Sequence, residues 1–217
     1  ENQNIKVVGI AGPGESLAND STFKTLKLID EKYPDLLKCL STNGLLLKEK
    51  ANELADLGVK TVTVTVNALD EKIAEKIYSW INFDKQILKG QDAARKLIDK
   101  QWEGILEAKR AGMLVKLNSV LIPEINLNEI EKIALKGKDY GADLMNLIPL
   151  IPLNMFKDLR PVSYTHLRAH ETVLDLVCRL LLEKKNISHG KKMHHSTRSA
   201  DIETDEPVSI RHEQQHH

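Results

Sequence analysis

The first 165 residues of this 217-residue chain contain no histidine, and the whole chain has only two cysteines, Cys39 and Cys178. Two cysteines are too few for a structural zinc site, a cysteine-held iron–sulfur site or a disulfide framework. Lysine plus arginine equals aspartate plus glutamate at 31 each, so no net charge favours nucleic acid. No apolar run reaches the roughly 18 residues of a membrane-spanning helix, and the N-terminus has no signal-peptide pattern. We therefore expect a cytoplasmic globular protein without a nucleic-acid or membrane partner.

All eight histidines lie at or beyond His166. Such a break in composition indicates either a histidine-rich metal-binding tail or sequence that is not native protein. Residues 163–172 (SYTHLRAHET) resemble a sequencing-library adapter translated in frame, and residues 175–184 (DLVCRLLLEK) resemble its distal end. We therefore predict two parts, a folded domain at residues 1–161 and an adapter-derived tail at residues 162–217 that is largely disordered.

Short apolar runs recur along the first part, each followed by a helical pattern. They cover residues 7–11, 37–40, 62–66, 114–121 and 144–150. Helical patterns fill the gaps at residues 21–33, 48–57, 92–111 and 126–140, the last with Asn126 or Asn128 as its cap. Crossovers of this length join parallel strands, so the pattern predicts an α/β fold with a parallel sheet.

Two segments refine this prediction. Valine and threonine alternate over residues 61–67, so one face of that strand should meet the outer helices while Thr65 and Asn67 face inward. Residues 79–90, with Trp80 and Phe83, are an extra segment before the fourth run. It could be a lid or a structural loop, and an insertion packed on the surface is the commoner outcome.

Polar or glycine-rich residues follow every apolar run, at the carboxyl ends where parallel α/β folds bind ligands. They are Gly12, Gly14 and Glu15 after the first run, Ser41, Thr42 and Asn43 after the second, Asn67 after the third, Asn118 and Ser119 in the fourth, and Asn146 in the fifth. Each alone is usually a turn. Together they predict a site for a polar ligand, and the Glu15 carboxylate suits an ammonium group. Without histidine for acid–base work, the chemistry should come from a cofactor.

Lys116 shares a strand face with Asn118. As a Schiff-base lysine it would suit an aldolase-type barrel, whereas as a rim lysine it would extend toward solvent. Both interpretations stay open from the residues alone.

Five segments carry a family resemblance: VVGIAGPGESLAN, CLSTNGLLL, VTVTVNALD, IYSWI and LVKLNSVLIPEIN. Together, over about residues 5–161, they resemble the radical S-adenosylmethionine enzymes that mature the nitrogenase cofactor. The resemblance implies a partial (β/α)6 TIM-type barrel, of which this chain would hold strands two to six and would be truncated at both ends. It implies S-adenosylmethionine binding by Gly12, Gly14, Glu15, Ser41, Thr42, Asn43, Thr65, Asn67, Asn118, Ser119 and Ile122.

In that family a [4Fe-4S] cluster reduces S-adenosylmethionine to a radical, and methyl transfer, carbide insertion and cluster fusion build the iron–molybdenum cofactor precursor. The resemblance thus implies an enzyme of lyase or transferase type, with iron–sulfur cluster substrates and nitrogenase assembly scaffold proteins as partners. The CxxxCxxC cluster motif is absent from this chain, and Cys39 fits buried structure better than a ligand. We expect no metal ligands or catalytic residues here, and a chain inactive by itself. The alternatives are another radical enzyme of cofactor biosynthesis, an aldolase-type barrel or a non-catalytic fragment.

Overall fold

The structure, a computed structural model, describes residues 5–12 and 14–160. The predicted adapter-derived tail, with its histidines, lies outside these residues. A parallel sheet runs through the described part in the order β1-β2-β3-β6-β7. Its strands are β1 Val7–Ile10, β2 Leu37–Thr42, β3 Val59–Thr65, β6 Leu114–Leu121 and β7 Leu144–Pro149. All five apolar runs are therefore strands, and the predicted α/β partial barrel is confirmed.

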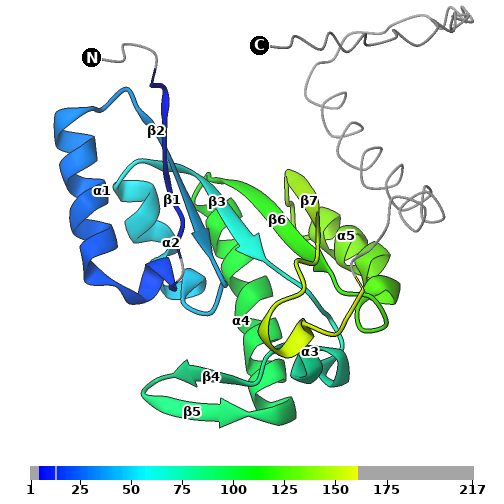
Figure 1. Cartoon of the computed structure of the whole chain (residues 1–217). Coiled ribbons are helices and arrows are strands. Elements are labelled where there is room, and N and C mark those ends of the chain that lie inside the picture. The colour runs from blue at the N-terminus through cyan, green and yellow to red at the C-terminus, as the bar shows by residue number, and fades with distance from the viewer. Residues whose placement is uncertain (1–4, 13, 161–217) are drawn as a thin grey trace, which may run out of the picture.

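Helices connect these strands and cover one face of the sheet (Figure 1). They are α1 Asp20–Lys32, α2 Leu47–Asp56, α3 Glu71–Ile77, α4 Gly90–Arg110 and α5 Ile130–Asp139, with short 3-10 turns η1 Ser16–Ala18, η2 Leu127–Glu129 and η3 Asn154–Phe156. The four predicted helices are confirmed within a few residues at their ends. Helix α3 was not predicted, because seven residues are too few to show a helical period.

The predicted cap of the fourth helix is wrong. No side chain caps η2 at Asn126 or α5 at Glu129. Asn126 instead turns back toward the sheet, and the Glu129 carboxylate accepts hydrogen bonds from the backbone N–H groups of Leu69 (2.6 Å) and Asp70 (2.8 Å). Glu129 thus satisfies backbone donors at the start of α3, which helps to explain why so short a helix is stable.

The extra segment is a β-hairpin of β4 (Trp80–Phe83) and β5 (Gln86–Lys89). Its turn uses Asp84 and Lys85 at positive φ (51° and 63°), the conformation that two-residue hairpin turns favour. Ile81 packs into a small apolar cluster with Ala93 and Leu97 of α4. The segment is therefore a hairpin packed on the surface, as the commoner interpretation expects (Figure 1), and a role as a lid stays a prediction.

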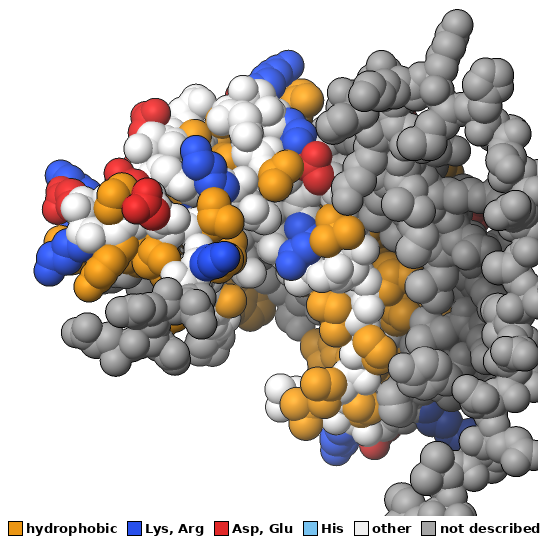
Figure 2. Space-filling model, turned by 90° about the horizontal axis from the view of Figure 1, so that it is seen from above, with side chains coloured by type: hydrophobic (Ala, Val, Ile, Leu, Met, Phe, Trp, Pro, Cys, Tyr) orange, Lys and Arg blue, Asp and Glu red, His pale blue; other side chains and the backbone are white. Residues whose placement is uncertain are grey.

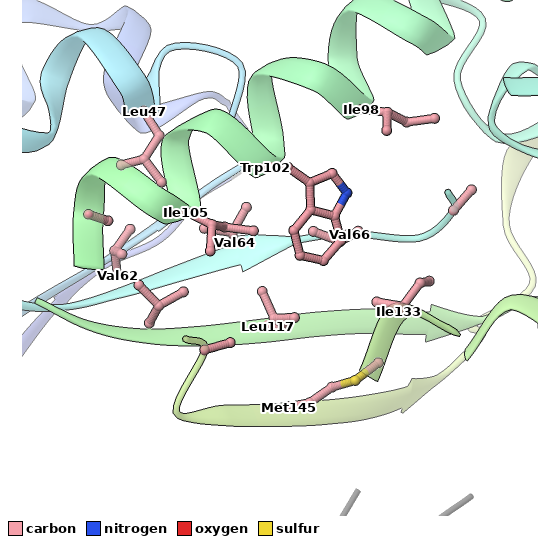
Figure 3. Packing of buried hydrophobic residues seen from close by; sticks show 14 of the residues in the cluster. Leu47, Val62, Val64, Val66, Ile98, Trp102, Ile105, Leu117, Ile133 and Met145 are labelled. Atoms are coloured by element: carbon pink, nitrogen blue, oxygen red, sulfur yellow. The ribbon is translucent and has the colours of Figure 1, made fainter. Parts of the chain in front are cut away.

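The main core lies between the sheet and the helices. Val62, Val64 and Val66 are fully buried on the helix side, as the alternation predicted. Figure 3 shows Trp102 and Ile105 of α4 over β3, with Leu117 and Met145 on the neighbouring strands. The long central helix thus holds β3 and β6 in place, and both strands carry candidate site residues at their ends.

The two ends of the sheet differ in character. The strands descend in Figure 1, so their carboxyl ends gather on the lower side, near the hairpin, α3 and η3. At their starts, Val7, Leu37, Leu114 and Leu144 are each about half exposed. Figure 2, seen from above, shows hydrophobic side chains interspersed with basic and acidic ones on that face. No helix among the described residues is long and apolar enough to span a membrane.

Candidate functional site

A hollow of about 420 Å³ lies at the carboxyl ends of β1, β2 and β3. It is lined by Ala11, Gly12, Gly14, Glu15, Ser41, Thr42, Asn43 and Thr65. The structure therefore brings seven of the eleven predicted cofactor-binding residues together, although they come from three separate segments. Ala11 was not predicted, because a small apolar residue at a strand end carries no chemical signal.

The Glu15 carboxylate lies at the centre of this arrangement. It accepts hydrogen bonds from the Thr42 hydroxyl (2.6 Å), the Asn43 backbone N–H (2.7 Å) and the Leu17 backbone N–H (3.0 Å). These bonds tie the loop after β1 to the end of β2 and cap η1. An ionised carboxylate offers about four lone-pair sites, so Glu15 can accept a further donor from a ligand.

The glycines before Glu15 leave the backbone open. A Cβ added at Gly12 or Gly14 would meet nothing within 4 Å. Both residues line the hollow, so a ligand can approach the main chain closely there, which a larger side chain would prevent. The open space at Gly12 and Gly14 agrees with the close ligand approach that the sequence predicts for these glycines.

The turn after β2 is fixed by its own side chains. The Thr42 hydroxyl accepts from the Gly44 N–H (3.0 Å), and Asn43 Oδ1 accepts from the Leu45 N–H (2.8 Å). Gly44 has φ +86°, and a Cβ there would lie 2.9 Å from Val64 Cγ1. Only glycine fits this position without strain, so the turn holds Thr42 and Asn43 in one arrangement.

A second hollow, of about 350 Å³, adjoins the first and shares Glu15 and Asn43 with it. Its other lining residues are mostly apolar: Ala18, Leu45, Leu46, Tyr78, Trp80, Ile81, Asn82 and Leu97. Trp80 of the hairpin is 59% exposed. Of the two interpretations of this segment, a lid would place Trp80 beside the site, where the second hollow has it, whereas a structural loop would not.

The ends of β3 and β6 carry polar residues of a different kind. Asn67 Oδ1 accepts from the Val120 N–H (2.8 Å) and its Nδ2 donates to the Tyr78 hydroxyl (3.0 Å). Asn126 is fully buried; its Nδ2 donates to the carbonyls of Asn67 (2.9 Å) and Val120 (2.8 Å), and its Oδ1 accepts from the Ile122 N–H (2.8 Å). These carboxamides therefore satisfy main-chain groups where the sheet ends.

The four other predicted cofactor-binding residues differ in burial. Asn67, Ser119 and Ile122 are buried, and the Ser119 hydroxyl donates to the Val66 carbonyl. Their contact with a ligand stays a prediction. Asn118 is half-buried and pairs with Thr65 and Asn146 across the sheet, and its Oδ1 is buried without a hydrogen-bond partner in the described part of the chain. Such an atom favours a donor from a bound molecule.

Lys116, the candidate Schiff-base lysine, and Cys39 lie elsewhere on the sheet. Lys116 is half-buried and pairs with Thr63 and Leu144, deeper in the sheet than Asn118. It lines none of the hollows described above. Cys39 is half-buried, and its thiol donates to the Val8 carbonyl at 3.5 Å, which fits a structural role.

The site combines a tyrosine of raised pKa with a lack of metal ligands among the described residues. Burial raises the pKa of Tyr78 to about 12, so its hydroxyl stays protonated at neutral pH. Within residues 5–12 and 14–160 no group of three histidine, cysteine, aspartate or glutamate side chains could hold a metal ion. The described residues therefore fit a polar organic ligand and do not fit an iron–sulfur cluster.

The fold and the hollow define a parallel α/β partial barrel with a glycine–glutamate loop at its carboxyl edge. The family model of the Radical SAM superfamily matches residues 1–136. The chain therefore belongs to the radical S-adenosylmethionine superfamily.

Similarity to individual proteins is more specific than the superfamily match. The chain is 54% identical over 160 residues to the FeMo cofactor biosynthesis protein NifB of Methanocaldococcus infernus, covering 74% of this chain and 53% of that protein. It is 53% identical over 165 residues to the protein of the same name from Methanocaldococcus jannaschii, covering 76% and 55%. The identity to NifB of Klebsiella pneumoniae is 48% over 148 residues, covering 68% and 32%. The chain thus spans about half the length, or less, of these curated relatives.

Among solved structures, the chain is similar to the radical S-adenosylmethionine methyltransferase TsrM from Kitasatospora setae, a structure with cobalamin and a [4Fe-4S] cluster bound. The TM-score is 0.49 at 13% sequence identity, covering 69% of this chain and 29% of that one.

Proposed function

We propose that this chain is the S-adenosylmethionine-binding part of an enzyme that assembles the precursor of the nitrogenase iron–molybdenum cofactor. The observation that carries the proposal is the hollow at Glu15, which gathers seven predicted residues at one edge of a radical S-adenosylmethionine barrel. The identities of 53–54% to two NifB proteins support the narrower assignment.

The residues of the hollow have distinct roles in this proposal. The Glu15 carboxylate receives the methionyl ammonium, since it keeps acceptor capacity beyond its three internal hydrogen bonds. The open backbone at Gly12 and Gly14 lets the methionyl group approach the main chain. Asn43 and Thr65 offer polar groups to the ribose. Ser41 and Thr42 complete the lining of this hollow. The proposal also includes Asn118 on the next strand, the buried Ser119, and Asn67 and Ile122, which line a separate hollow.

A [4Fe-4S] cluster would supply the electron that cleaves S-adenosylmethionine in the complete enzyme. The described residues include no ligand set for it, so what these residues do is bind and orient S-adenosylmethionine. We further propose that the complete protein acts as a lyase or transferase in the cytoplasm, on iron–sulfur cluster substrates delivered by nitrogenase assembly scaffold proteins.

A chimera tests the function. Residues 5–160 would replace the aligned segment of the Methanocaldococcus infernus protein, which is 54% identical, and the purified chimera would be assayed under reducing, anaerobic conditions. We expect formation of 5′-deoxyadenosine from S-adenosylmethionine. The matched control is the same chimera with Glu15→Gln, which should form far less product.

One outcome of the chimera experiment would contradict the proposal. A chimera that folds, holds its iron–sulfur cluster and leaves S-adenosylmethionine intact would show that this segment does not bind the cofactor productively.

A further inference from the structure

Gln101 lies on the inner face of α4, between apolar neighbours. It is 1% exposed, and the residues around it on the same face, Ile98, Trp102 and Ile105, are buried core residues. Burying a carboxamide is unfavourable unless its hydrogen-bonding groups are satisfied. A polar side chain at this core position therefore needs a structural explanation.

Both amide hydrogens of Gln101 are donated to backbone carbonyls of residues that line the hollow. Its Nε2 donates to the carbonyl of Asn43 (2.9 Å) and to the carbonyl of Thr65 (2.8 Å). Gln101 also interacts with the Tyr78 side chain. Both donors of the carboxamide are thus satisfied at the helix–sheet boundary.

The two carbonyls lie where β2 and β3 cease to pair with each other. The last paired residues of these two strands are Thr42 and Val64, so Asn43 and Thr65 stand one residue beyond the β2–β3 ladder, while Thr65 still pairs with Asn118 of β6. Gln101 joins them across that gap. Its Cγ also lies 2.9 Å from where a Cβ on Gly44 would be, so the turn after β2 packs directly against it.

We propose that Gln101 is a positioning residue of the ligand hollow. Without lining the hollow, it fixes the separation of Asn43 and Thr65, and so sets where their side chains meet the ligand. This inference rests on the proposed binding of S-adenosylmethionine at that hollow. Because a small displacement of binding groups weakens binding strongly, loss of the bridge should reduce affinity as well as stability.

The test compares Gln101→Met with Ile105→Ala in the full chain. Methionine is similar in length and unbranched but donates no hydrogen bond, and Ile105 is a fully buried core residue one turn along α4. Affinity for S-adenosylmethionine is measured by NMR titration of ¹⁵N-labelled protein at millimolar ligand, at a temperature where every variant is folded. The amide nitrogens of Gly44 and Val66 report the two peptide carbonyls directly.

We expect Gln101→Met to bind S-adenosylmethionine about tenfold more weakly than the unmodified chain and to shift the Gly44 and Val66 nitrogens before ligand is added. Ile105→Ala should lose thermal stability and keep the original affinity. If Gln101→Met binds as tightly as the unmodified chain, Gln101 is structural only and the inference is wrong. If the unmodified chain itself shows no binding, the proposed function fails instead.

A milder variant covers the case in which Gln101→Met does not fold. Gln101→Asn keeps the carboxamide but is one methylene shorter, so it can reach at most one of the two carbonyls. Its affinity should lie between those of the unmodified chain and of a variant without the bridge. An unchanged affinity, with both nitrogens shifted, would overturn the inference.

Discussion

Polar residues at two neighbouring parts of the carboxyl edge of this sheet have different roles. At the β1–β2 end, meaning residues 12–18 and 41–46, side chains such as Glu15 and Asn43 line a hollow while also fixing their own loops. At the β3–β6 end, meaning residues 66–69 and 118–126, the Asn126 side chain bonds main-chain groups. Asn67 bonds the Val120 N–H and the Tyr78 hydroxyl, and it lines a separate, mostly apolar hollow of about 330 Å³.

The difference teaches how to interpret a polar residue at a strand end. Where a strand leaves the ladder and its backbone bends away, the exposed N–H and C=O groups must find partners, and a nearby carboxamide can supply them. At the β1–β2 end Glu15, Thr42 and Asn43 also satisfy backbone donors, but these side chains line a hollow, and the Glu15 carboxylate keeps acceptor capacity for a ligand.

The largest effect is expected for Asn126→Ala. The change leaves the Ile122 N–H and the carbonyls of Asn67 and Val120 without partners in the interior. We expect the free energy of unfolding to fall by about 4 kcal/mol, measured by urea denaturation. Asn128→Ala is the control, because Asn128 is exposed and its loss should change little. Equal stability of the two variants would show that the β3–β6 end is not held by Asn126.

Alkaline pH should weaken the same end. Burial raises the pKa of Tyr78 to about 12, so an unfolded chain ionises this tyrosine near pH 10 while the folded chain does not. Its stabilising contribution is complete below about pH 10 and is lost as the pH rises to about 12, by roughly 2 to 3 kcal/mol. Tyr78→Phe should remove this part of the pH dependence. Parallel curves for the two proteins between pH 10 and 12 would contradict the burial.

Gly44→Ala should be destabilising, by about 2 kcal/mol. The residue has φ +86°, and the new Cβ would collide with Val64 and with Gln101. Gly12→Ala is the matched comparison at the β1–β2 end, because its Cβ enters open space. Thermal unfolding should separate the two, with Gly12→Ala close to the original stability but weaker in S-adenosylmethionine binding. A stable Gly44→Ala would mean that the turn tolerates another conformation.

Glu15→Gln should have the smallest effect on stability, about 1 kcal/mol. The new amide can keep the bonds from Thr42 and Leu17 through its oxygen, but its NH₂ group then faces the Asn43 N–H, which also donates. Affinity for S-adenosylmethionine should fall more clearly, because the ammonium loses its anionic partner. Calorimetric unfolding and ligand titration measure the two effects. Full affinity in this variant would remove Glu15 from the proposed site.

Sequence reasoning succeeded where the signal is periodic or local. Apolar runs predicted all five sheet strands, and alternation predicted the buried face of β3. The residues of the hollow were predicted because carboxyl ends of parallel strands converge. Sequence could not show that Asn126 faces the sheet instead of capping its helix, since both roles use the same amide.

Gln101 was missed for a related reason. In the sequence it is one polar residue among many in a long amphipathic helix, and only the packing of α4 against β2 and β3 makes it a bridge. Helix α3 was missed because seven residues show no helical period, and one of its stabilising contacts comes from Glu129, sixty residues away along the chain from Leu69.

Hydrogen–deuterium exchange with and without saturating S-adenosylmethionine tests the contrast most directly. Ligand binding at the β1–β2 end should slow exchange over residues 12–18 and 41–46, whereas residues 122–130, already held by Asn126 and Glu129, should change little. Protection confined to residues 118–130, with residues 12–18 unaffected, would contradict the account and place the ligand at the other end of the sheet edge.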